Sequence, residues 1–498
     1  MLSRRLLIGI SLSTVFVLLC HAPDAAATGA GEQLFKLTAS GAEGGDNFGI
    51  SVGISGNTAI VGAHLGDAGW GTTGTAYLFD VSTGSQLFEL TADDAAAGDQ
   101  FGYSVAVVGN TAIVGARLDD EAGNNAGAAY LFDVTTGEQL FKLIADDTAD
   151  GDELGCAVAI SGNTAVVGAW KHNYGGSDAG AAYLFDVATG KQLRKLTAGD
   201  GAEGDRFGVS VGIVENTAVV GAHWNDDAGL NSGSAYLFDV ATGEQLFKLT
   251  AKDGAMAEYF GYSVGINRTT VIVGAYWDAS AGNRAGSAYL FDVETGNELF
   301  ELTAEDAAPG DIFGYSVGIN ENTAIVGARF DDDGGSTSGS AYLFDIVTGE
   351  QINKLTANDA TEFDHFGYSV SISEDKCIAG APANDDVGAA YAFKSLADPP
   401  TSVTTGFTPR FVAHPNPFRS KTTISFDLPS SGFARLAVYD VRGRLVRTLM
   451  EGPQAAGSGV RNWEGYTNAG VRAPVGVYFV RLETGGSVSR SRKIVLMR

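Results

Sequence analysis

The stretch from Phe313 to Ala357 decides the fold: FGYSVGINENTAIVGARFDDDGGSTSGSAYLFDIVTGEQINKLTA. Its first seven residues alternate in the manner of a β-strand, and a short turn leads into the apolar segment TAIVGA. A longer loop rich in Asp, Gly and Ser follows, and a Val-Thr-Gly turn, in which Gly allows a positive φ, separates the last two segments. The stretch therefore predicts four antiparallel strands, at residues 313–319, 323–328, 339–346 and 350–357.

The same pattern occurs seven times along the chain, and each repeat begins 53 residues after the previous one. Its clearest mark is a Phe-Gly pair, which becomes Leu-Gly in the third repeat, and a Gly-Ala pair follows 14 residues later. These pairs begin at Phe48, Phe101, Leu154, Phe207, Phe260, Phe313 and Phe366. Four-stranded units repeated at a fixed period near 50 residues are typical of the blades of a β-propeller.

The two ends of the repeat region indicate how the ring closes. The third-strand segment of the seventh repeat, residues 388–394, is not followed by a fourth-strand segment. A spare copy of that segment lies far earlier, at residues 32–39, and can complete the seventh blade. Closure would also protect a sheet edge that otherwise invites aggregation. The predicted fold class is therefore all-β: a seven-bladed β-propeller closed by the N-terminal strand, followed by a small C-terminal β-sandwich.

The chain divides into four segments by composition. Residues 1–27 have a basic start, an apolar stretch and a small-residue cleavage site, which predicts a signal peptide. Residues 28–397 form the expected propeller, 398–410 a linker rich in Pro, Thr and Ser, and 411–498 a domain of strand-like segments. No other stretch is long and apolar enough to cross a membrane, so we expect an exported mature protein without a transmembrane span.

The charges of the two expected domains are opposite. Residues 28–397 carry 16 Lys and Arg against 52 Asp and Glu, whereas residues 398–498 carry 14 against 6. An acidic body disfavours nucleic acid as a partner, because phosphates need Lys and Arg, and it favours cations or basic partners. Cys156 and Cys377 occupy positions that are apolar in other repeats, so we expect two buried thiols and no disulfide.

The Phe-Gly pair, the Gly-Ala pair and the Gly-Ser-Ala-Tyr-Leu-Phe strand resemble the FG-GAP repeat of integrin-α-like seven-bladed propellers, over residues 31–397. The resemblance implies an extracellular binding or cell-adhesion protein. In the integrin type, an Asp-x-Asp-x-Asp-Gly calcium loop often lies between Phe-Gly and Gly-Ala. Here short turns such as Ser55-Gly56-Asn57 occupy that place, so calcium, if it binds, is expected at other loops.

The C-terminal domain carries a second resemblance. Pro-Asn-Pro-Phe at residues 415–418, Tyr-Asp-Val-Arg-Gly-Arg at 439–444 and Gly-Val-Tyr-Phe-Val-Arg-Leu at 476–482 resemble the C-terminal sorting domain of the bacterial type IX secretion system. They are equally similar to the immunoglobulin-like domain of flagellar hook-capping proteins. The first resemblance implies recognition by secretion machinery and delivery to the outside of the outer membrane, so we expect a secreted or cell-surface protein. The alternative is a plain sandwich that serves as a spacer.

The strand order places the functional loops. In a four-strand meander the tight one–two and three–four turns lie at one end, and the long two–three and four–one loops at the other. Variable loops on a rigid scaffold are where recognition usually resides. An acidic residue precedes each Phe-Gly position by two, and these seven carboxylates either ring the channel mouth as a cation site or accept backbone N–H groups that order the loop. Their presence in every repeat favours the ordering role: Asp46, Asp99, Asp152, Asp205, Glu258, Asp311 and Asp364.

The two–three loops carry the candidate metal ligands. Clustered Asp with Gly suits Ca²⁺, which takes several oxygen ligands from a flexible loop, although no repeat has full EF-hand spacing. The alternative is a solvated turn that keeps the blades soluble. The candidate calcium ligands are Asp119, Asp120, Asp226, Asp227, Asp331, Asp332, Asp333, Asp385 and Asp386.

Aromatic and Arg residues that follow the Gly-Ala pairs are the candidate ligand-binding residues. Such side chains resemble binding hot spots, and aromatic faces also suit sugars. The alternative is that the rings pack between neighbouring blades. The candidates are Trp170, His223, Trp224, Tyr276, Trp277, Arg329 and Phe330.

The sequence offers no catalytic motif: there is no HExxH, no Gly-x-Ser-x-Gly and no phosphate-binding Gly-Lys-Ser/Thr loop. We therefore expect a non-catalytic propeller that binds an extracellular protein or glycan. A structural surface-layer protein with an acidic ion-binding shell is the alternative, and an extracellular hydrolase a weaker one.

Overall fold

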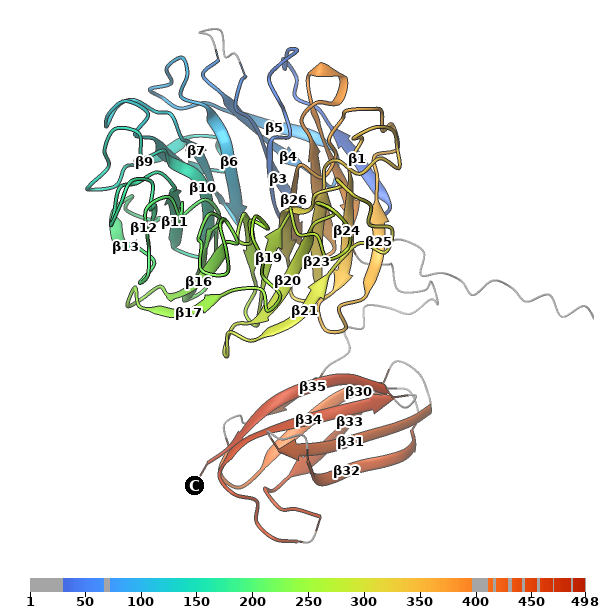
Figure 1. The fold of residues 1–498 in the computed structure, drawn as a ribbon. Helices are drawn as coiled ribbons and strands as arrows, with labels where there is room; N and C mark the ends of the chain where they lie inside the picture. The colour runs from blue at the N-terminus through green and yellow to red at the C-terminus, as the bar shows by residue number, and fades with distance from the viewer. Residues whose placement is uncertain are drawn as a thin grey trace, which may run out of the picture. The chain divides into compact units, whose positions relative to one another are not determined.

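The computed structural model describes residues 30–66, 72–395, 411–414, 418–428, 432–440, 444–454, 457–468, 470–484 and 487–497. The chain divides into two units, Met1–Pro400 and Thr401–Arg498, each of which we describe by itself (Figure 1). Apart from one short 3₁₀ turn, Asn384–Asp386, the elements of the described residues are strands. The predicted signal peptide and linker lie outside the described residues, and the described part holds no helix long and apolar enough to span a membrane.

The first unit is a ring of seven four-stranded antiparallel sheets, so the seven-bladed propeller is confirmed. Blades 1 to 3 comprise β2 (Ser51–Ser55), β3 (Thr58–Ala63), β4 (Thr75–Asp80) and β5 (Ser85–Leu90); β6 (Phe101–Val108), β7 (Thr111–Ala116), β8 (Ala128–Asp133) and β9 (Gln139–Leu143); and β10 (Leu154–Ser161), β11 (Thr164–Ala169), β12 (Ala181–Asp186) and β13 (Gln192–Leu196).

Blades 4 to 7 continue the series. They comprise β14 (Val211–Val214), β15 (Thr217–Ala222), β16 (Ser234–Asp239) and β17 (Gln245–Leu249); β18 (Ser263–Ile266), β19 (Thr270–Ala275), β20 (Ser287–Asp292) and β21 (Glu298–Leu302); β22 (Phe313–Ile319), β23 (Thr323–Ala328), β24 (Ser340–Asp345) and β25 (Gln351–Leu355); and β26 (Ser369–Ser373), β27 (Lys376–Ala381), β28 (Ala389–Lys394) and β1 (Gln33–Leu37). The first strand of each blade contacts the first strands of both neighbours, so the first strands surround the axis of the ring.

The ring closes through β1, as the sequence predicts. This strand pairs antiparallel with β28, with Phe35 opposite Ala392 and Leu37 opposite Ala390. The N–H of Gly31 extends the ladder by donating to the carbonyl oxygen of Lys394 at 2.8 Å. Leu37 is 0% exposed, in a hydrophobic cluster that joins blade 7 to blade 1. The first described strand of the chain therefore completes the last blade.

The two glycines that mark each repeat lie where neighbouring blades touch. A Cβ on Gly274, from a Gly-Ala pair, would lie 2.0 Å from the carbonyl oxygen of Gly314, from the next Phe-Gly pair. Gly314 itself has a φ of +84°, and a Cβ there would lie 2.2 Å from the carbonyl oxygen of Ser287. Only glycine tolerates both constraints. The marks that reveal the repeat are therefore contacts between blades.

The Phe of each Phe-Gly pair fills the core of its blade. The ring of Phe313 meets those of Tyr342 and Phe344 edge to face, with centroids 5.5 and 5.8 Å apart. Such pairs add about 0.5–1.5 kcal/mol beyond the area they bury. Cys156 and Cys377 are buried free thiols, so the expectation of no disulfide between them is confirmed. Burial raises the pKa of Cys156 to about 12, which keeps the thiol protonated at neutral pH.

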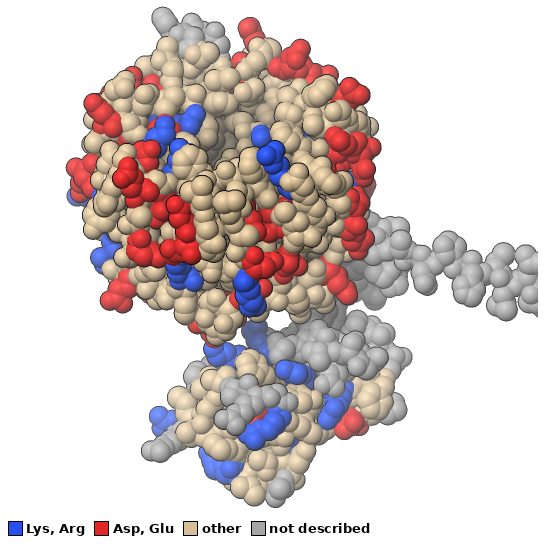
Figure 2. All heavy atoms as spheres, viewed as in Figure 1, with Lys and Arg blue, Asp and Glu red and all other residues tan. Residues whose placement is uncertain are grey.

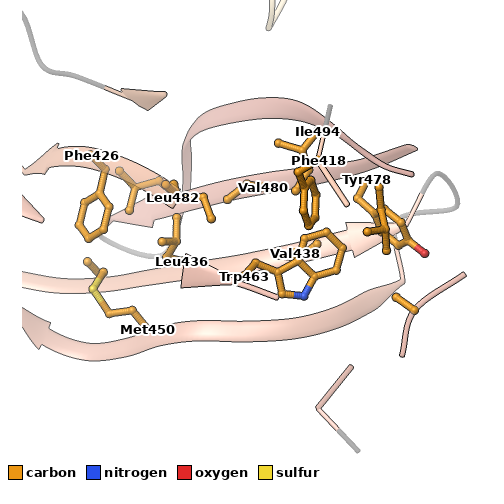
Figure 3. Close-up of a cluster of buried hydrophobic side chains, with 14 of the residues drawn as sticks. Phe418, Phe426, Leu436, Val438, Met450, Trp463, Tyr478, Val480, Leu482 and Ile494 are labelled. Atoms are coloured by element: carbon orange, nitrogen blue, oxygen red, sulfur yellow. The ribbon is translucent and has the colours of Figure 1, made fainter. Parts of the chain in front are cut away.

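The second unit is a β-sandwich, as predicted. One sheet has the order β29 (Phe411–His414), β30 (Thr422–Leu428), β33 (Gly457–Trp463), and the other β32 (Leu445–Gln454), β31 (Gly432–Asp440), β34 (Gly476–Thr484), β35 (Ser487–Leu496). Between them Trp463 packs against Phe418 and Tyr478 in one buried cluster (Figure 3). β33 gives little sign of a strand in the sequence, because its residues, GSGVRNW, lack the alternation of apolar side chains.

Candidate functional site

A cavity of about 520 Å³ lies on the axis of the propeller. Three consecutive residues from the first strand of every blade, or from the turn that leads into it, form its wall. Side chains from the long loops of blades 3, 4 and 5 complete its mouth: Trp170, Arg206, His223, Trp224, Tyr259 and Tyr276. The cavity therefore opens on the end of the ring that carries the two–three and four–one loops.

Three positions of each repeat bring varied side chains to this region. The residue after Gly-Ala is His64, Arg117, Trp170, His223, Tyr276, Arg329 or Pro382, and the residue after Phe-Gly is Ile50, Tyr103, Cys156, Val209, Tyr262, Tyr315 or Tyr368. The residue before Phe-Gly is Asn47, Gln100, Glu153, Arg206, Tyr259, Ile312 or His365, each with a left-handed φ between 51° and 59°. A backbone conformation that non-glycine residues rarely adopt thus recurs seven times while its side chain changes. The backbone is scaffold, and the side chains distinguish the blades.

The acidic residue two positions before each Phe-Gly orders the four–one loop. The Asp205 carboxylate accepts the backbone N–H of Ala202 at 3.0 Å, and the Asp311 carboxylate that of Ala308 at 2.7 Å. The other five make the same contact, and all seven are buried. Burial raises the pKa of Asp311 to about 6. The loop-ordering role is therefore confirmed, and these carboxylates are absent from the cavity lining.

Tyrosine rings form a continuous cluster across blades 5, 6 and 7. Tyr276 stacks on Tyr259 at 5.4 Å and meets Tyr262 edge to face at 4.6 Å. The hydroxyl of Tyr262 donates to the hydroxyl oxygen of Tyr315 at 3.0 Å, and Tyr315 in turn contacts Tyr368. Burial raises the pKa of Tyr276 to about 12, so this phenol stays neutral at physiological pH. The cluster lines the cavity with both ring surfaces and hydroxyl groups.

His223 lies in the middle of the aromatic mouth and is 3% exposed. Its ring contacts Trp224, Tyr262 and Trp170, with centroids 5.7, 5.5 and 6.4 Å away. Burial, together with the nearby charge of Arg206, lowers its pKa to about 3. The imidazole is therefore neutral at physiological pH, and its buried Nδ1 has no hydrogen-bond partner among the described residues.

Arg206 lies against two indoles at the mouth. Its guanidinium carbon is 3.3 Å from the centroid of the Trp224 ring and 4.7 Å from that of Trp170. Trp170 donates its Nε1–H to Glu153 at 2.8 Å, and the same carboxylate pairs with Arg117 at 3.0 Å and with Lys171. Glu153 is thus already engaged by three donors, and Arg206 is left to the aromatic rings.

The ligand-binding residues expected from the sequence separate into two groups. Trp170, His223, Trp224 and Tyr276 line the cavity, where the structure brings them together. Trp277, Arg329 and Phe330 lie outside the lining: Trp277 packs on Tyr259 at 5.1 Å, and the guanidinium of Arg329 lies 4.5 Å from the Phe330 ring centroid. Contacts such as Trp170 with His223 join neighbouring blades, so the expected packing role is present in the same rings.

Several lining residues were not expected from the sequence. They flank the Phe-Gly pairs, and a comparison of the seven repeats at these two positions would have revealed them, because the flanks vary widely while the pair changes only at Leu154. They are Tyr103, Arg206, Tyr259, Tyr262, Tyr315 and Tyr368.

Lysine side chains from the outermost strands form ion pairs with the carboxylates of the acidic two–three loops. Lys354 Nζ lies 2.7 Å from Asp306, 3.0 Å from Asp331 and 2.5 Å from Asp333. These three carboxylates offer oxygens within 4.8 Å of one another, close enough for a shared cation, and the lysine lies among them. Lys142 pairs in the same way with Asp119, and Lys248 with Asp227.

The remaining candidate calcium ligands have other roles in the structure. The carboxylates of Asp120, Asp226 and Asp332 accept backbone N–H groups within their own loops, at 2.6–2.7 Å. Asp385 lies 3.5 Å from Lys36, and the backbone carbonyl of Asp386 accepts the N–H of Gly45 at 2.7 Å. Calcium binding at these loops stays a prediction.

Blade 5 departs from this arrangement because Glu301 stands where three other blades have the lysines described above. Glu301 accepts the hydroxyl of Ser280 at 2.7 Å, and the backbone N–H of Ser280 donates to Asp278 at 2.7 Å. Tyr289 donates to Asp278 at 3.0 Å and lies 3.4 Å from Asp253. The carboxylates of Asp253, Asp278 and Glu301 therefore lie beside the hydroxyl groups of Ser280 and Tyr289, whereas those of blade 6 lie beside an ammonium group.

The charge of the propeller surface contrasts with that of its mouth. Figure 2 shows Asp and Glu scattered over the visible face of the propeller, whereas Lys and Arg predominate on the C-terminal unit. Arg206 is the one Lys, Arg, Asp or Glu side chain among the residues that line the cavity. The lining therefore carries a single positive charge within an acidic domain.

The comparisons with known proteins agree with the two units. The FG-GAP repeat matches seven segments, at residues 32–79, 85–132, 138–185, 191–238, 244–291, 297–344 and 350–393. The FlgD Ig-like domain matches residues 416–487. A search of curated proteins found no match. Seven repeats over most of the chain, folded as seven blades, show that this protein belongs to the FG-GAP repeat family, with a FlgD Ig-like domain after the propeller.

Proposed function

We propose that the protein is a non-catalytic binding propeller, secreted or displayed on a bacterial cell surface, that captures an extracellular protein or glycan ligand at its axial cavity. The observation that carries the proposal is that the varied residue after Phe-Gly in all seven blades, with five residues from the other two varied positions, lines one cavity of about 520 Å³. Small-molecule sites commonly enclose about 300–1,000 Å³ and combine apolar and aromatic surface with a few polar groups.

The division of labour within each repeat supports this role. The Phe-Gly and Gly-Ala glycines are held constant by close contacts between blades, for example between Gly274 and Gly314. Beside them, the varied residue after Phe-Gly lines the cavity in all seven repeats, and Trp170, Arg206, His223, Tyr259 and Tyr276 line it from the other two varied positions. Binding sites are commonly built this way, from variable side chains on a rigid scaffold.

The C-terminal domain would act in delivery. We propose that it is a sorting domain recognised by secretion machinery, which the match of residues 416–487 to an Ig-like domain supports at the level of the fold. Fusing residues 398–498 to a reporter in a bacterium with a type IX system tests this role. Reporter on the cell surface is the expected result, and reporter retained in the periplasm would contradict it.

Calcium dependence is a further part of the proposal. The carboxylates of Asp306, Asp331 and Asp333 in blade 6 offer oxygens within 4.8 Å of one another, and a calcium ion there would displace the Lys354 ammonium group. Ca²⁺ prefers several oxygen ligands, which carboxylates, hydroxyls and backbone carbonyls of these loops supply. Calcium is expected to raise the melting temperature, and a flat titration would contradict this part of the proposal.

A structural surface-layer protein with an acidic ion-binding shell is the second candidate. The 52 acidic residues of residues 28–397 exceed the 16 basic ones, so many carboxylates are left for ions. Such a protein needs no specific ligand, and its behaviour would depend on ionic conditions and not on the cavity.

Screening the full chain on glycan and matrix-protein arrays, with and without calcium, tests the proposal. Trp224→Ala and Tyr262→Ala remove cavity surface, whereas Val347→Ala changes a turn residue that is 75% exposed at the opposite end of a blade. We expect a ligand whose capture is lost in the two cavity variants and kept in the control. Capture that survives both cavity variants would refute the cavity as the site.

A further inference from the structure

We propose that the axial cavity takes the end of an acidic saccharide, whose carboxylate pairs with the guanidinium of Arg206. This inference rests on the proposed binding function and names the class of ligand.

Arg206 is unusual among the basic residues of the propeller. Of the 16 Lys and Arg in residues 28–397, 11 form an ion pair within 4 Å in the described part of the chain. Among the rest, Arg206 and Arg329 are the two whose Nε is buried without a hydrogen-bond partner. In a domain so rich in carboxylates, two half-buried guanidinium groups without a carboxylate are unexpected, because burying an unpaired charge is costly.

Of these two, Arg206 is the one that reaches the cavity. It belongs to the lining, whereas Arg329 does not, and the guanidinium carbon of Arg329 lies 4.0 Å from the Tyr315 ring centroid and 4.9 Å from that of Tyr368. Burial lowers the pKa of Arg206, while the charges of Asp178 and Glu153 oppose that effect. Arg206 still carries its charge at neutral pH, because the ordinary pKa of a guanidinium exceeds 12.

The guanidinium of Arg206 is oriented and preorganised by stacking on Trp224. A planar guanidinium held by a ring keeps its edge N–H groups for a partner, and a carboxylate can accept two of them in parallel. An incoming carboxylate would supply the ion pair that the propeller's own acidic residues do not make. The geometry therefore favours an anionic group at the mouth.

The rest of the lining favours a saccharide as the carrier of that group. The aromatic faces of Trp170 and Tyr276 suit the C–H surfaces of sugar rings, and the hydroxyls of Tyr103 and Tyr368 can exchange hydrogen bonds with sugar hydroxyls. Seven strands close the cavity on all sides, so it admits the end of a chain and not an extended segment. An acidic peptide end shares the anionic group and is an outcome of the test.

The test is calorimetric titration of the full chain with two acidic saccharides, each paired with a neutral counterpart. Trigalacturonate is compared with its methyl ester, and sialyllactose with lactose. Arg206→Gln removes the charge, Arg206→Lys keeps the charge without the fork, and Arg284→Gln is the matched control. Arg284 also lies over an indole, 4.1 Å from the centroid of Trp277, but it is exposed and outside the lining. Circular dichroism verifies that each variant is folded.

We expect at least one acidic saccharide to bind at least tenfold more tightly than its neutral counterpart. This preference should vanish in Arg206→Gln, shrink in Arg206→Lys, persist in Arg284→Gln and weaken with added salt. If neither acidic saccharide binds more tightly than its counterpart, or if Arg206→Gln keeps the preference, the inference is overturned. Binding of an acidic peptide in place of both saccharides also overturns it. A neutral ligand that Trp224→Ala releases would overturn the acidic class and leave the proposed function standing.

Discussion

Deleting residues 28–40 should open the propeller ring, and a peptide of residues 30–40 added in trans should close it again. The deletion removes β1, which supplies the fourth strand of blade 7. It leaves β28 as an unpaired edge and uncovers the cluster into which Leu37 packs. An exposed edge and an uncovered apolar face both destabilise the blade.

The magnitude can be worked from one side chain. Leu37 is 0% exposed, and truncating a buried Leu to Ala costs about 2–5 kcal/mol. A Leu37→Ala peptide should therefore bind the deletion variant about 30-fold to several thousandfold more weakly than the native peptide. Thr38, the next residue, is exposed, so Thr38→Ala should change the affinity by less than about threefold.

Two measurements check this prediction. Thermal melting compares the complete chain with the deletion variant, alone and with each peptide, and calorimetry gives the three peptide affinities. We expect the native and Thr38→Ala peptides to restore the melting temperature and the Leu37→Ala peptide to fail at the same concentration. An unchanged melting temperature after the deletion, or equal affinities of the two substituted peptides, would refute closure by β1.

Three other predictions concern the scaffold and the site. His223 has a folded pKa of about 3 against about 6.5 unfolded, so its contribution to stability is complete above pH 6.5 and is lost as the pH falls toward 3. As the pH falls from 6.5 to 4, the free energy of unfolding should therefore decrease more steeply in the native protein than in His223→Gln. The difference in slope should reach up to about 1.4 kcal/mol per pH unit. Equal slopes of unfolding free energy against pH in the two proteins would contradict this. Lys354→Gln leaves three carboxylates without their ammonium partner, so the melting temperature of this variant should fall. Calcium should then raise the melting temperature of the variant more than that of the native protein. An equal effect of calcium on both proteins would argue that the Lys354 ammonium group does not occupy a cation site. Gly274→Ala places a Cβ 2.0 Å from a carbonyl oxygen of the next blade, so it should lower the free energy of unfolding, measured with urea, by about 1–3 kcal/mol or more. Gly44→Ala, where a Cβ meets open space, should lower it little. Equal losses in the two variants would contradict the role of Gly274 as a contact between blades.

The fold could be predicted almost completely because the repeat presents the same local pattern seven times. In blade 6 the first two predicted strands match β22 and β23 residue for residue. The third was predicted one residue too long at each end, at 339–346 against Ser340–Asp345. Gly339 has a φ of +84°, and the Asp345 carboxylate accepts the N–H of Val347 in the following turn, so both ends leave the strand conformation.

The candidate site could be predicted only in part, because its residues meet across blades. Trp170 and Trp224 were expected from their place after the Gly-Ala pairs, and both line the cavity. Arg206, which lies between them in the sequence, was missed because a charged residue in a four–one loop is ordinarily expected to be exposed to solvent. Its stacking on both indoles depends on how two blades pack, and no local periodicity encodes that.

Tyr262 was missed for a different reason. On the first strand of its blade it reads as an alternating core residue, and only closure of the ring turns that position toward an axial cavity. The role of the acidic residues before Phe-Gly could be predicted from the sequence. Their presence in every repeat indicated a structural role, and the N–H bond to Asp205 is one of seven equivalent contacts.

A crystal structure of the full chain with its highest-affinity ligand from the array screen tests the central claim most directly. The account predicts ligand density in the axial cavity, in contact with Trp224 and with a carboxylate on Arg206. Ligand density on the outermost strands or at the tight-turn end of the ring, with the cavity empty, would contradict it.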